Sequence, residues 1–339
     1  MHQVAVHGPN DVRVDEAEPP EPGPRDVVVR VAACGICGSD LTYIGMGGFC
    51  VTGGPMPLGH EMSGTVEWVG PEVSGTSVGQ RVVVFPGDPG VDGYDIIGNG
   101  GAEGGLTERL LVRDAARGRR VFPVPDDLSL DVAALAEPVA VGMKSATRTG
   151  AGRADRVAVF GCGPIGLSAI ATFAEQGVDV VGVDLSRRRL ELAAELGAGH
   201  VLHPGEVDVW EDLTRLHGGM SYMGGTLPRT DAYVEASGSA AVVNDILGSA
   251  RPNSTVSLVA VHMAPVELSL LSIMSKQLEL KGSMGYPERF EDAIDMLTRR
   301  DLSAMITHRV PLTDFGDALE VLGTDKDCGK VLVTTGEGQ

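Results

Sequence analysis

Val157-Ala-Val-Phe-Gly-Cys-Gly-Pro-Ile-Gly166 is the stretch of sequence that decides the fold. A short apolar strand runs into three glycines, Gly161, Gly163 and Gly166, and a helix opens behind them. The first glycine permits a tight turn, the second lets backbone approach a pyrophosphate, and the third lets the helix pack closely on the strand. The N-terminus of that helix also favours the charge of a phosphate. The stretch therefore predicts a dinucleotide-binding turn.

Apolar strands alternate with amphipathic helices on the C-terminal side of this turn. We expect strands at 156–160, 178–184, 200–203, 231–235, 254–261 and 277–282, helices at 164–176, 186–196, 207–217 and 239–250, and a loop at 218–230. This alternation predicts an α/β architecture in which helices cover a parallel sheet, the doubly wound Rossmann arrangement.

The second strand of this series ends in Asp184, 21 residues after Gly163. A carboxylate there accepts hydrogen bonds from an adenosine ribose and repels a 2′-phosphate, so NAD is favoured over NADP. The run Arg187-Arg188-Arg189 leaves NADP open, because these side chains could embrace that phosphate, pack on the adenine or face water. The residues expected at the cofactor are Gly161, Gly163, Pro164, Ile165, Gly166, Asp184 and Arg189.

The first 130 or so residues have a different pattern, since β-branched runs bounded by Pro and Gly recur at 26–31, 64–70 and 79–85. Such runs predict an irregular, mostly β domain. A helical pattern begins at Val132. Helix 288–299 and the strand Gly329-Lys-Val-Leu-Val333 lie beyond the α/β region and are candidates to rejoin the first domain.

Composition limits the possible partners and locations. The 339 residues include 27 Lys and Arg against 46 Asp and Glu, a net charge of −19 that argues against nucleic acid or an anionic membrane as partner. No apolar run approaches the roughly 20 residues that span a bilayer, and no export signal is visible, so we expect a cytoplasmic enzyme. Five scattered cysteines favour free thiols or a metal ligand over a disulfide framework.

A second constellation lies at Cys34-Gly-Ile-Cys37-Gly-Ser39-Asp40 and Gly59-His60-Glu61. Thiolate, imidazole and carboxylate are ligands that zinc prefers, and a catalytic zinc keeps one position open beside three protein ligands. The cysteine pair alone could be a redox pair or half of a structural zinc site, although no second Cys-x-x-Cys exists to complete one. His60 alone could be an ordinary core histidine.

These motifs, with Val78-Gly-Gln-Arg-Val82, Glu137-Pro138 and the Gly329–Val333 strand, resemble the zinc-dependent medium-chain dehydrogenases over nearly the whole chain. The resemblance is greatest to the branch of sorbitol, butanediol and threonine dehydrogenases. It implies a chaperonin-10-like, β-rich catalytic domain at 1–132 and 284–339, a Rossmann domain at 133–283, and an active site in the cleft between them. It also implies a homo-oligomer, a tetramer or dimer joined near edge strands of the Rossmann sheets, for which we expect Ser254–His262 to lie closest to the seam.

The resemblance assigns roles to the second constellation. It implies that Cys37 and His60 bind the catalytic zinc and that Cys34 is a small buried thiol. Either Glu61 or Glu137 can be the third ligand, and we expect both to bind or touch the metal. It places Ser39 where a hydroxyl takes the alcohol proton and Asp40 where a carboxylate steadies a ligand. In the implied reaction zinc acts as a Lewis acid and the alcohol gives hydride to the nicotinamide. Ser39 as a helix cap, Asp40 as a turn residue and Glu137 as part of a helix entry stay open alternatives.

The chain also departs from its relatives. No Cys lies between Cys50 and Cys162, where many relatives hold a structural zinc, so we expect one zinc per subunit and a Gly-rich lobe at 86–105. Thr42 replaces a relay histidine, and Gly285 stands where polyol enzymes carry an arginine, which argues against a highly hydroxylated substrate. The expected pocket walls are Thr42, Tyr43, Met46, Phe49, Met284 and Tyr286, although Met and aromatic residues are as often plain core.

The sequence thus predicts a zinc-dependent dehydrogenase, linked to NAD or NADP, that interconverts a secondary alcohol or small diol with a ketone. A polyol dehydrogenase is the nearest alternative. Two alternative hypotheses belong to other functional classes: a zinc-free quinone or enone reductase, and a dinucleotide-binding sensor without turnover.

Overall fold

The computed structural model describes residues 1–50, 53–87, 96–115 and 120–336. The chain forms two compact units. The first joins Met1–Glu137 to Glu288–Gln339, and the second is Pro138–Pro287. Among the described residues no helix is both long and apolar enough to cross a bilayer.

The second unit contains a six-stranded, wholly parallel sheet with the order β11-β10-β9-β14-β15-β16. Its strands are β9 (Arg156–Phe160), β10 (Asp179–Val183), β11 (His200–Leu202), β14 (Ala232–Glu235), β15 (Thr255–Leu258) and β16 (Glu279–Gly282). Counted along the chain this is the order 3-2-1-4-5-6 of a Rossmann fold, which reverses direction between β9 and β14. The expected doubly wound sheet is confirmed.

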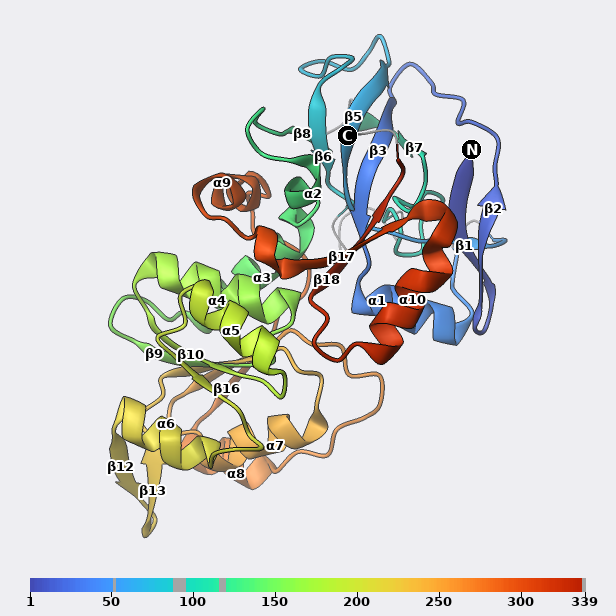
Figure 1. Cartoon of the computed structure of the whole chain (residues 1–339). Helices are drawn as coiled ribbons and strands as arrows, with labels where there is room; N and C mark the ends of the chain where they lie inside the picture. The colour runs from blue at the N-terminus through green and yellow to red at the C-terminus, as the bar shows by residue number, and fades with distance from the viewer. Residues whose placement is uncertain (51–52, 88–95, 116–119, 337–339) are drawn as a thin grey trace. The chain divides into compact units, whose positions relative to one another are not determined.

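Helices accompany each crossover of this sheet (Figure 1). They are α3 (Ala136–Thr149), which crosses into this unit, α4 (Pro164–Gln176), α5 (Arg187–Glu195), α6 (Val209–His217), α7 (Ala240–Ser249) and α8 (Leu270–Lys276). Helix α4 has Pro164 in its first turn and is followed by Gly177, whose φ of 71° caps the last turn. Proline at the start and left-handed glycine at the end are the favoured terminators of a helix.

The expected loop at 218–230 is wrong. The segment forms a hairpin of β12 (Gly219–Tyr222) and β13 (Gly225–Pro228). Met223 and Gly224 make the two-residue turn with φ values of 48° and 84°. Positive φ at both positions is the turn that matches the twist of a hairpin, and it is usually signalled by Asn-Gly. Methionine at the first position hides that signal in the sequence.

The first unit is built mainly of strands, as expected. They are β1 (His2–Gly8), β2 (Asp11–Glu16), β3 (Val27–Gly35), β4 (Met56–Pro57), β5 (Glu61–Val69), β6 (Arg81–Val84), β7 (Arg109–Val112), β8 (Val121–Pro123), β17 (Ile306–Pro311) and β18 (Lys330–Thr334). One sheet has the order β17-β18-β3-β5-β6-β8 with β7 also paired to β3, and a second has the order β2-β1-β4. The chaperonin-10-like, β-rich fold is confirmed.

The C-terminal segment completes the main sheet of this unit. β18 pairs antiparallel with β3, with Leu332 opposite Gly35 and Val333 opposite Cys34. In Figure 1 the red C-terminal strands lie beside the blue strand β3, although almost the whole sequence separates them. The last strand therefore belongs to the same sheet as the first long strand of the chain.

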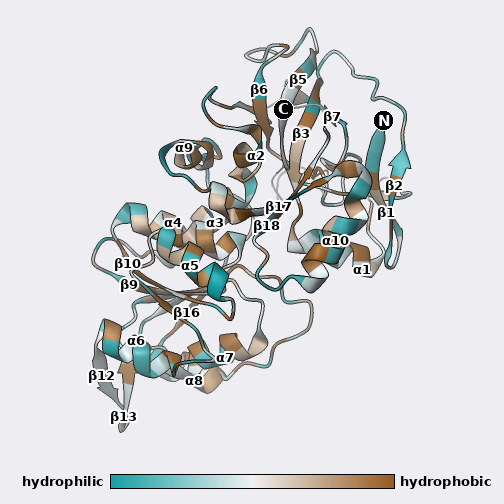
Figure 2. Cartoon of the chain, in the orientation of Figure 1, coloured by the Kyte–Doolittle hydropathy of each residue, from teal (hydrophilic) through white to brown (hydrophobic). Residues whose placement is uncertain are grey.

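The α-helices that accompany the sheets in the described part of the first unit are α1 (Gly38–Met46), α2 (Leu130–Ala133), the start of α3, α9 (Glu291–Arg299) and α10 (Phe315–Thr324). Helix α10 carries hydrophobic and hydrophilic residues on different faces (Figure 2). Phe315 and Ala318 on its apolar face join the valine-rich core formed by β3, β5 and β18. Burial of this face stabilises the helix more than its intrinsic propensity does.

β15 lies inside the sheet rather than at its edge. It pairs with β14 on one side and β16 on the other, so its backbone groups are used within the sheet. The expected position of Ser254–His262 near a subunit seam stays a prediction. The outer strands of the sheet are β11 and β16.

Candidate functional site

The strand registers of the first unit bring three distant segments together. Gly35 lies opposite Glu61 in the β3–β5 pair and opposite Leu332 in the β18–β3 pair. Gly35 has no side chain, and a Cβ placed on it would lie 2.0 Å from Oε2 of Glu61 and 3.1 Å from Cδ of Lys330. The glycine thus leaves room for a carboxylate and an ammonium group at the centre of the sheet.

Cys37, His60 and Glu61 form a metal-binding arrangement. Cys37 precedes the first turn of α1, His60 follows Gly59, whose φ is 94°, and Glu61 is the first residue of β5. One donor atom from each of the three residues lies within 4.8 Å of the others. The structure therefore brings together the thiol, imidazole and carboxylate that the sequence singled out.

The same group contains buried polar atoms that lack protein hydrogen bonds. Within the described residues, Nδ1 of His60 and Oε2 of Glu61 are both buried without a partner. Buried polar atoms in folded proteins are nearly always satisfied by a protein group, water or an ion. A thiolate, an imidazole nitrogen and a carboxylate oxygen that converge in this way fit Zn²⁺, which takes three protein ligands in catalytic sites.

Charge around His60 also fits a cation. Burial alone would lower the pKa of His60, but Asp40, Cys37 and Glu137 raise it well above its ordinary value. Oδ2 of Asp40 accepts a hydrogen bond of 2.8 Å from the backbone N–H of Cys37, while its Oδ1 lies 3.7 Å from Nδ1 of His60. That second distance is too long for a hydrogen bond. Negative groups therefore surround His60, whose imidazole also hydrogen bonds to the side chain of Cys37.

Cys34 lies outside this group, as expected for a buried thiol. Its side chain is buried, and burial, followed by the nearby carboxylates of Asp40 and Glu61, raises the pKa of the thiol well above its usual value. The Sγ atom donates to the carbonyl of Gly35 over 3.6 Å. A neutral, hydrogen-bonded thiol of this kind is a packing residue.

Lys330 is a residue that sequence reasoning missed. Its Nζ donates to Oε1 of Glu61 over 2.7 Å and to the carbonyl of Ile36 over 3.0 Å, and the side chain is buried. Burial would lower the pKa of Lys330, but Glu61, Cys37 and Glu137 raise it. The only signal in the sequence was a lysine at the start of the apolar strand Gly329–Val333.

Glu137 and Ser39 do not belong to the group of converging donor atoms. Glu137 is buried and close enough to influence the pKa values of His60 and Lys330, but it is not one of the three converging donors. Ser39 lies half-buried in the first turn of α1, two residues after Cys37. The carboxylate that the structure brings to the metal group is therefore that of Glu61.

The expected pocket residues fall in both units. In the first unit Tyr43 and Phe49 meet edge to face with ring centroids 5.1 Å apart, and burial, then the charges of Asp40 and Cys37, raises the pKa of Tyr43 to about 12. Thr42 donates from Oγ1 to the carbonyl of Gly38, and Met46 is exposed.

Of the two pocket residues in the second unit, Met284 is exposed and Tyr286 is buried. Part of the expected Gly-rich lobe at 86–105, residues 88–95, lies outside the described residues.

In the second unit the glycine-rich turn has the expected geometry. Gly161 has a φ of 91°, and a Cβ on Gly166 would lie 1.8 Å from the carbonyl oxygen of Gly161. A Cβ on Gly163, in contrast, would meet no protein atom within 4 Å. Gly161 and Gly166 thus allow the turn to pack closely, while Gly163 faces open space at the N-terminus of α4. This cradle fits a pyrophosphate.

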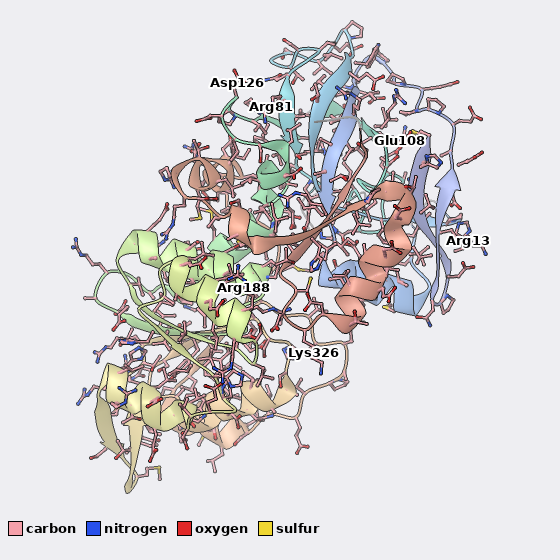
Figure 3. The ribbon with its side chains drawn as sticks, in the orientation of Figure 1. Arg13, Arg81, Glu108, Asp126, Arg188 and Lys326 are labelled. Carbon is pink, nitrogen blue, oxygen red and sulfur yellow. The ribbon has the colours of Figure 1, made fainter. Side chains whose placement is uncertain are left out.

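Asp184 holds the same turn from the end of β10. Its carboxylate accepts from the backbone N–H of Cys162 over 2.6 Å and from that of Ser186 over 2.8 Å. Of the three consecutive arginines, Arg187 forms an ion pair with Glu206. Arg188, which is labelled in Figure 3, forms an ion pair with Glu191. Arg189 is half-buried. These exposed ion pairs satisfy the first two arginines without a phosphate.

A second group of possible metal ligands lies near β17 and β18. Donor atoms of His308, Asp325 and Cys328 lie within 4.8 Å of one another. However, Nδ1 of His308 faces Thr307 and Cys328, whereas Nε2 lies 3.8 Å from Asp325. The two nitrogens of the imidazole therefore face different partners. The donor atoms of the three residues do not point to one metal position.

Comparison with known proteins gives matches along the whole chain. Residues 23–126 match the alcohol dehydrogenase GroES-like domain, and residues 164–299 match the zinc-binding dehydrogenase family. The chain is 31% identical to (R,R)-butanediol dehydrogenase of Neisseria gonorrhoeae, covering 92% of each chain. It is also 31% identical to human sorbitol dehydrogenase, covering 94% of this chain and 91% of the human enzyme.

Solved structures agree with these relatives. 2R,3R-butanediol dehydrogenase from Bacillus subtilis has a TM-score of 0.85 at 30% identity, covering 98% of this chain and 99% of the other. An alcohol dehydrogenase from Escherichia coli CFT073, complexed with NADH, has a TM-score of 0.84 at 26% identity over 98% and 99% of the two chains. Motifs, fold and relatives lead to one conclusion: the chain belongs to the zinc-dependent medium-chain dehydrogenases, oxidoreductases that act on alcohol groups with a nicotinamide cofactor.

Proposed function

We propose that this dehydrogenase uses one zinc ion per subunit and NAD to interconvert a secondary alcohol or small diol with its ketone. The first unit would carry the catalytic residues and the second the cofactor. The observation that carries the proposal is the convergence of Cys37, His60 and Glu61, with buried donor atoms on His60 and Glu61 that lack a protein partner in the described chain. A zinc-free enone reductase would not require these three groups together.

In this proposal Cys37, His60 and Glu61 hold the metal, and Glu61 is favoured over Glu137 because only Glu61 belongs to the converging group. Zinc, when bound, supplies Lewis-acid chemistry that lowers the pKa of an alcohol. Asp40 fixes Cys37 through the backbone N–H at the start of α1. Lys330 orients Glu61 by donating to Oε1, and Oε2 has no hydrogen-bond partner among the described residues.

Oxidation of an alcohol also releases a proton, which needs an acceptor in the first unit. Ser39 is our candidate, because its hydroxyl lies two residues after Cys37 in the first turn of α1 and is half-buried. Thr42 lies one turn further along the same helix and would extend a proton path towards solvent. A hydroxyl both accepts and donates a proton, so either residue suits a relay.

NAD is the favoured cofactor because Asp184 places a carboxylate beside the glycine turn, where it would repel a 2′-phosphate. Two of the three arginines that could offset this repulsion are paired on the protein surface. Gly161, Gly163, Pro164, Ile165, Gly166 and Arg189 complete the proposed cofactor contacts.

Two observations bear on the substrate. The relatives named for butanediol support a small diol, and Gly285 supplies no side chain that could hydrogen bond to a polyol. Tyr43, Met46 and Phe49 would give apolar walls on the side of α1. The similarity to human sorbitol dehydrogenase keeps a polyol as the second candidate substrate class.

Metal analysis of purified protein tests the proposal. We expect about one zinc per chain, its loss in Cys37→Ser, and its retention in Cys34→Ala, which alters a buried thiol of the same motif outside the metal group. Reduction of NAD by secondary alcohols and diols should disappear with the zinc. Native protein that holds no zinc and still reduces enones would contradict the proposal.

We also propose that the protein forms a homo-oligomer through the edge of the second unit. β16 is an outer strand, and Leu270, Leu271 and Met274 of α8 in the same unit are 74%, 70% and 68% exposed. A free strand edge with an exposed apolar helix in the same unit suits a second copy of the chain. Sedimentation of Leu271→Glu should show a smaller species than wild type. A cytoplasmic location stays a prediction from the sequence.

A further inference from the structure

Glu235 is a buried carboxylate to which the proposed function assigns no role. It ends β14 and is 0% exposed. Its Oε1 accepts from the backbone N–H groups of Ser237 and Gly238, each over 2.9 Å, and from Oγ of Ser237 over 2.6 Å. An ionised group in the interior is costly unless hydrogen bonds satisfy it, so this carboxylate is held in one position.

The second oxygen of Glu235 holds His262. Nε2 of His262 lies 3.0 Å from Oε2 of Glu235, and the imidazole is 18% exposed. A carboxylate only accepts hydrogen bonds, so Nε2 donates and carries the ring proton. In the neutral ring Nδ1 is then an acceptor. Among the described residues, the structure shows no donor to Nδ1.

The pair lies beside the glycine turn. Ala236, the residue after Glu235, donates its backbone N–H to the carbonyl of Phe160, which precedes Gly161. A Cβ on Gly161 would lie 2.7 Å from backbone atoms of Ala236 and Ser237. The segment that Glu235 anchors is therefore packed directly against the turn proposed to hold the pyrophosphate.

His262 and Asp184 lie on opposite sides of the point where the strand order reverses. Asp184 follows β10, on one side of β9, whereas His262 follows β15, beyond β14 on the other side. A dinucleotide on this fold spans the carboxyl ends of the strands across that point. With the adenosine ribose at Asp184 and the pyrophosphate at the glycine turn, the other half of the dinucleotide extends towards β14 and β15.

We propose that His262, fixed by Glu235, binds the nicotinamide riboside half of the cofactor through Nδ1. This inference rests on the proposed cofactor site and adds to it a binding residue, His262, and a positioning residue, Glu235. The nicotinamide riboside offers two kinds of donor that suit an imidazole acceptor, the ribose hydroxyls and the carboxamide N–H. A fixed imidazole holds one orientation of the ring and so loses little freedom when the cofactor binds.

Two substitutions test the contributions of Nε2 and Nδ1 separately. His262→Gln places its terminal amide near the position of Nε2, so it keeps a donor for Glu235 but removes the acceptor at Nδ1. His262→Asn places its terminal amide near the position of Nδ1, so it keeps an acceptor there but gives up the contact with Glu235. His262→Ala removes both, and His200→Ala, an exposed histidine of β11, is the control.

Calorimetric titration with ADP, ADP-ribose and NADH tests the proposal without turnover. Loss of one hydrogen bond predicts that NADH binds about 3- to 10-fold more weakly to His262→Ala and His262→Gln. His262→Asn and His200→Ala should bind NADH within about twofold of wild type, and ADP should bind all variants equally. A loss that already appears with ADP-ribose assigns the contact to the ribose, and a loss with NADH alone assigns it to the carboxamide.

Two results would overturn the proposal. Unchanged NADH affinity in His262→Gln and His262→Ala would show that Nδ1 makes no contact with the cofactor. Equal weakening of ADP and NADH binding would show that the histidine only supports the fold of the glycine turn. Wild-type protein that binds neither ADP nor NADH would instead contradict the proposed cofactor site, so the two failures can be told apart.

Discussion

Lys330 of the last strand donates a 2.7 Å hydrogen bond to Oε1 of Glu61, and both side chains are buried. Each charge is the main compensation for the other. The ammonium also reaches the carbonyl of Ile36 over 3.0 Å, so the pair is tied to the end of β3 as well. Removal of one partner would leave the other charge buried without an opposite charge beside it.

We therefore expect Lys330→Met to lower the free energy of unfolding of the metal-free protein by about 3–5 kcal/mol. The double variant Lys330→Met with Glu61→Gln should recover much of that loss, because neither charge then remains. Chemical denaturation of the wild type, the two single variants and the double variant measures the coupling. Additive losses would show that the two side chains do not depend on each other.

Gly35→Ala should weaken zinc binding. The new Cβ would lie 2.0 Å from Oε2 of Glu61, the oxygen that we propose as the metal ligand, so the carboxylate must move. We expect zinc affinity to fall about 10–100-fold, the range seen when ligand orientation is disturbed. Gly38→Ala is the control, since a Cβ there meets no atom within 4 Å. Competition with a chromophoric chelator measures both, and wild-type affinity in Gly35→Ala would refute the assignment of Glu61 as a ligand.

Asp184→Asn should change the choice of cofactor. The substitution removes the charged acceptor that we propose for the ribose hydroxyls. Hydrogen bonds to charged groups contribute about 1.5–3 kcal/mol, so the Kd of NAD should rise at least about tenfold. The Kd of NADP should rise less or fall, because the repulsion of the 2′-phosphate is gone. Glu191→Gln, which loses only an exposed ion pair with Arg188, should leave both Kd values unchanged. An unaltered ratio of NADP to NAD affinity would contradict this role of Asp184.

Substitutions of two glycines in the turn should have different effects, one on the free energy of unfolding and the other on ADP binding. Gly166→Ala sets a Cβ 1.8 Å from the carbonyl oxygen of Gly161, and we expect a loss of about 1–3 kcal/mol in the free energy of unfolding. Gly163→Ala meets no protein atom within 4 Å, so stability should hold while ADP binding weakens at least about tenfold. Thermal unfolding and calorimetry distinguish the two. Normal ADP binding by Gly163→Ala would rule out the proposed approach of the pyrophosphate.

Elements with strong local signals could be predicted closely. Helix α4 begins at Pro164 and ends at Gln176, the bounds expected from a glycine turn before it and Gly177 after it. The hairpin β12–β13 could not, because Met223 adopts a conformation that its residue type rarely takes. Helix α8 was missed as well, since its apolar residues lie on an exposed surface rather than on a buried face.

The residues of the candidate site also differ in how far the sequence could predict them. Cys37, His60 and Glu61 could be chosen from residue types and spacing, because zinc ligands have a limited chemistry. Lys330 and His262 could not be assigned roles, because their functions depend on partners 269 and 27 positions away in the sequence. Such partners are set by strand register and sheet order, which local sequence patterns do not encode.

The pairing of β18 with β3 has a consequence for synthesis of the chain. A ribosome releases β3 and Glu61 early, but the strand that supplies Lys330 emerges only after the entire second unit. Until then the end of β3 at 33–35 lacks the strand that pairs with it, and Glu61 lacks its counter-charge. The nascent first unit therefore stays incomplete until the second unit has been synthesised, and its open strand end is exposed to aggregation during that interval.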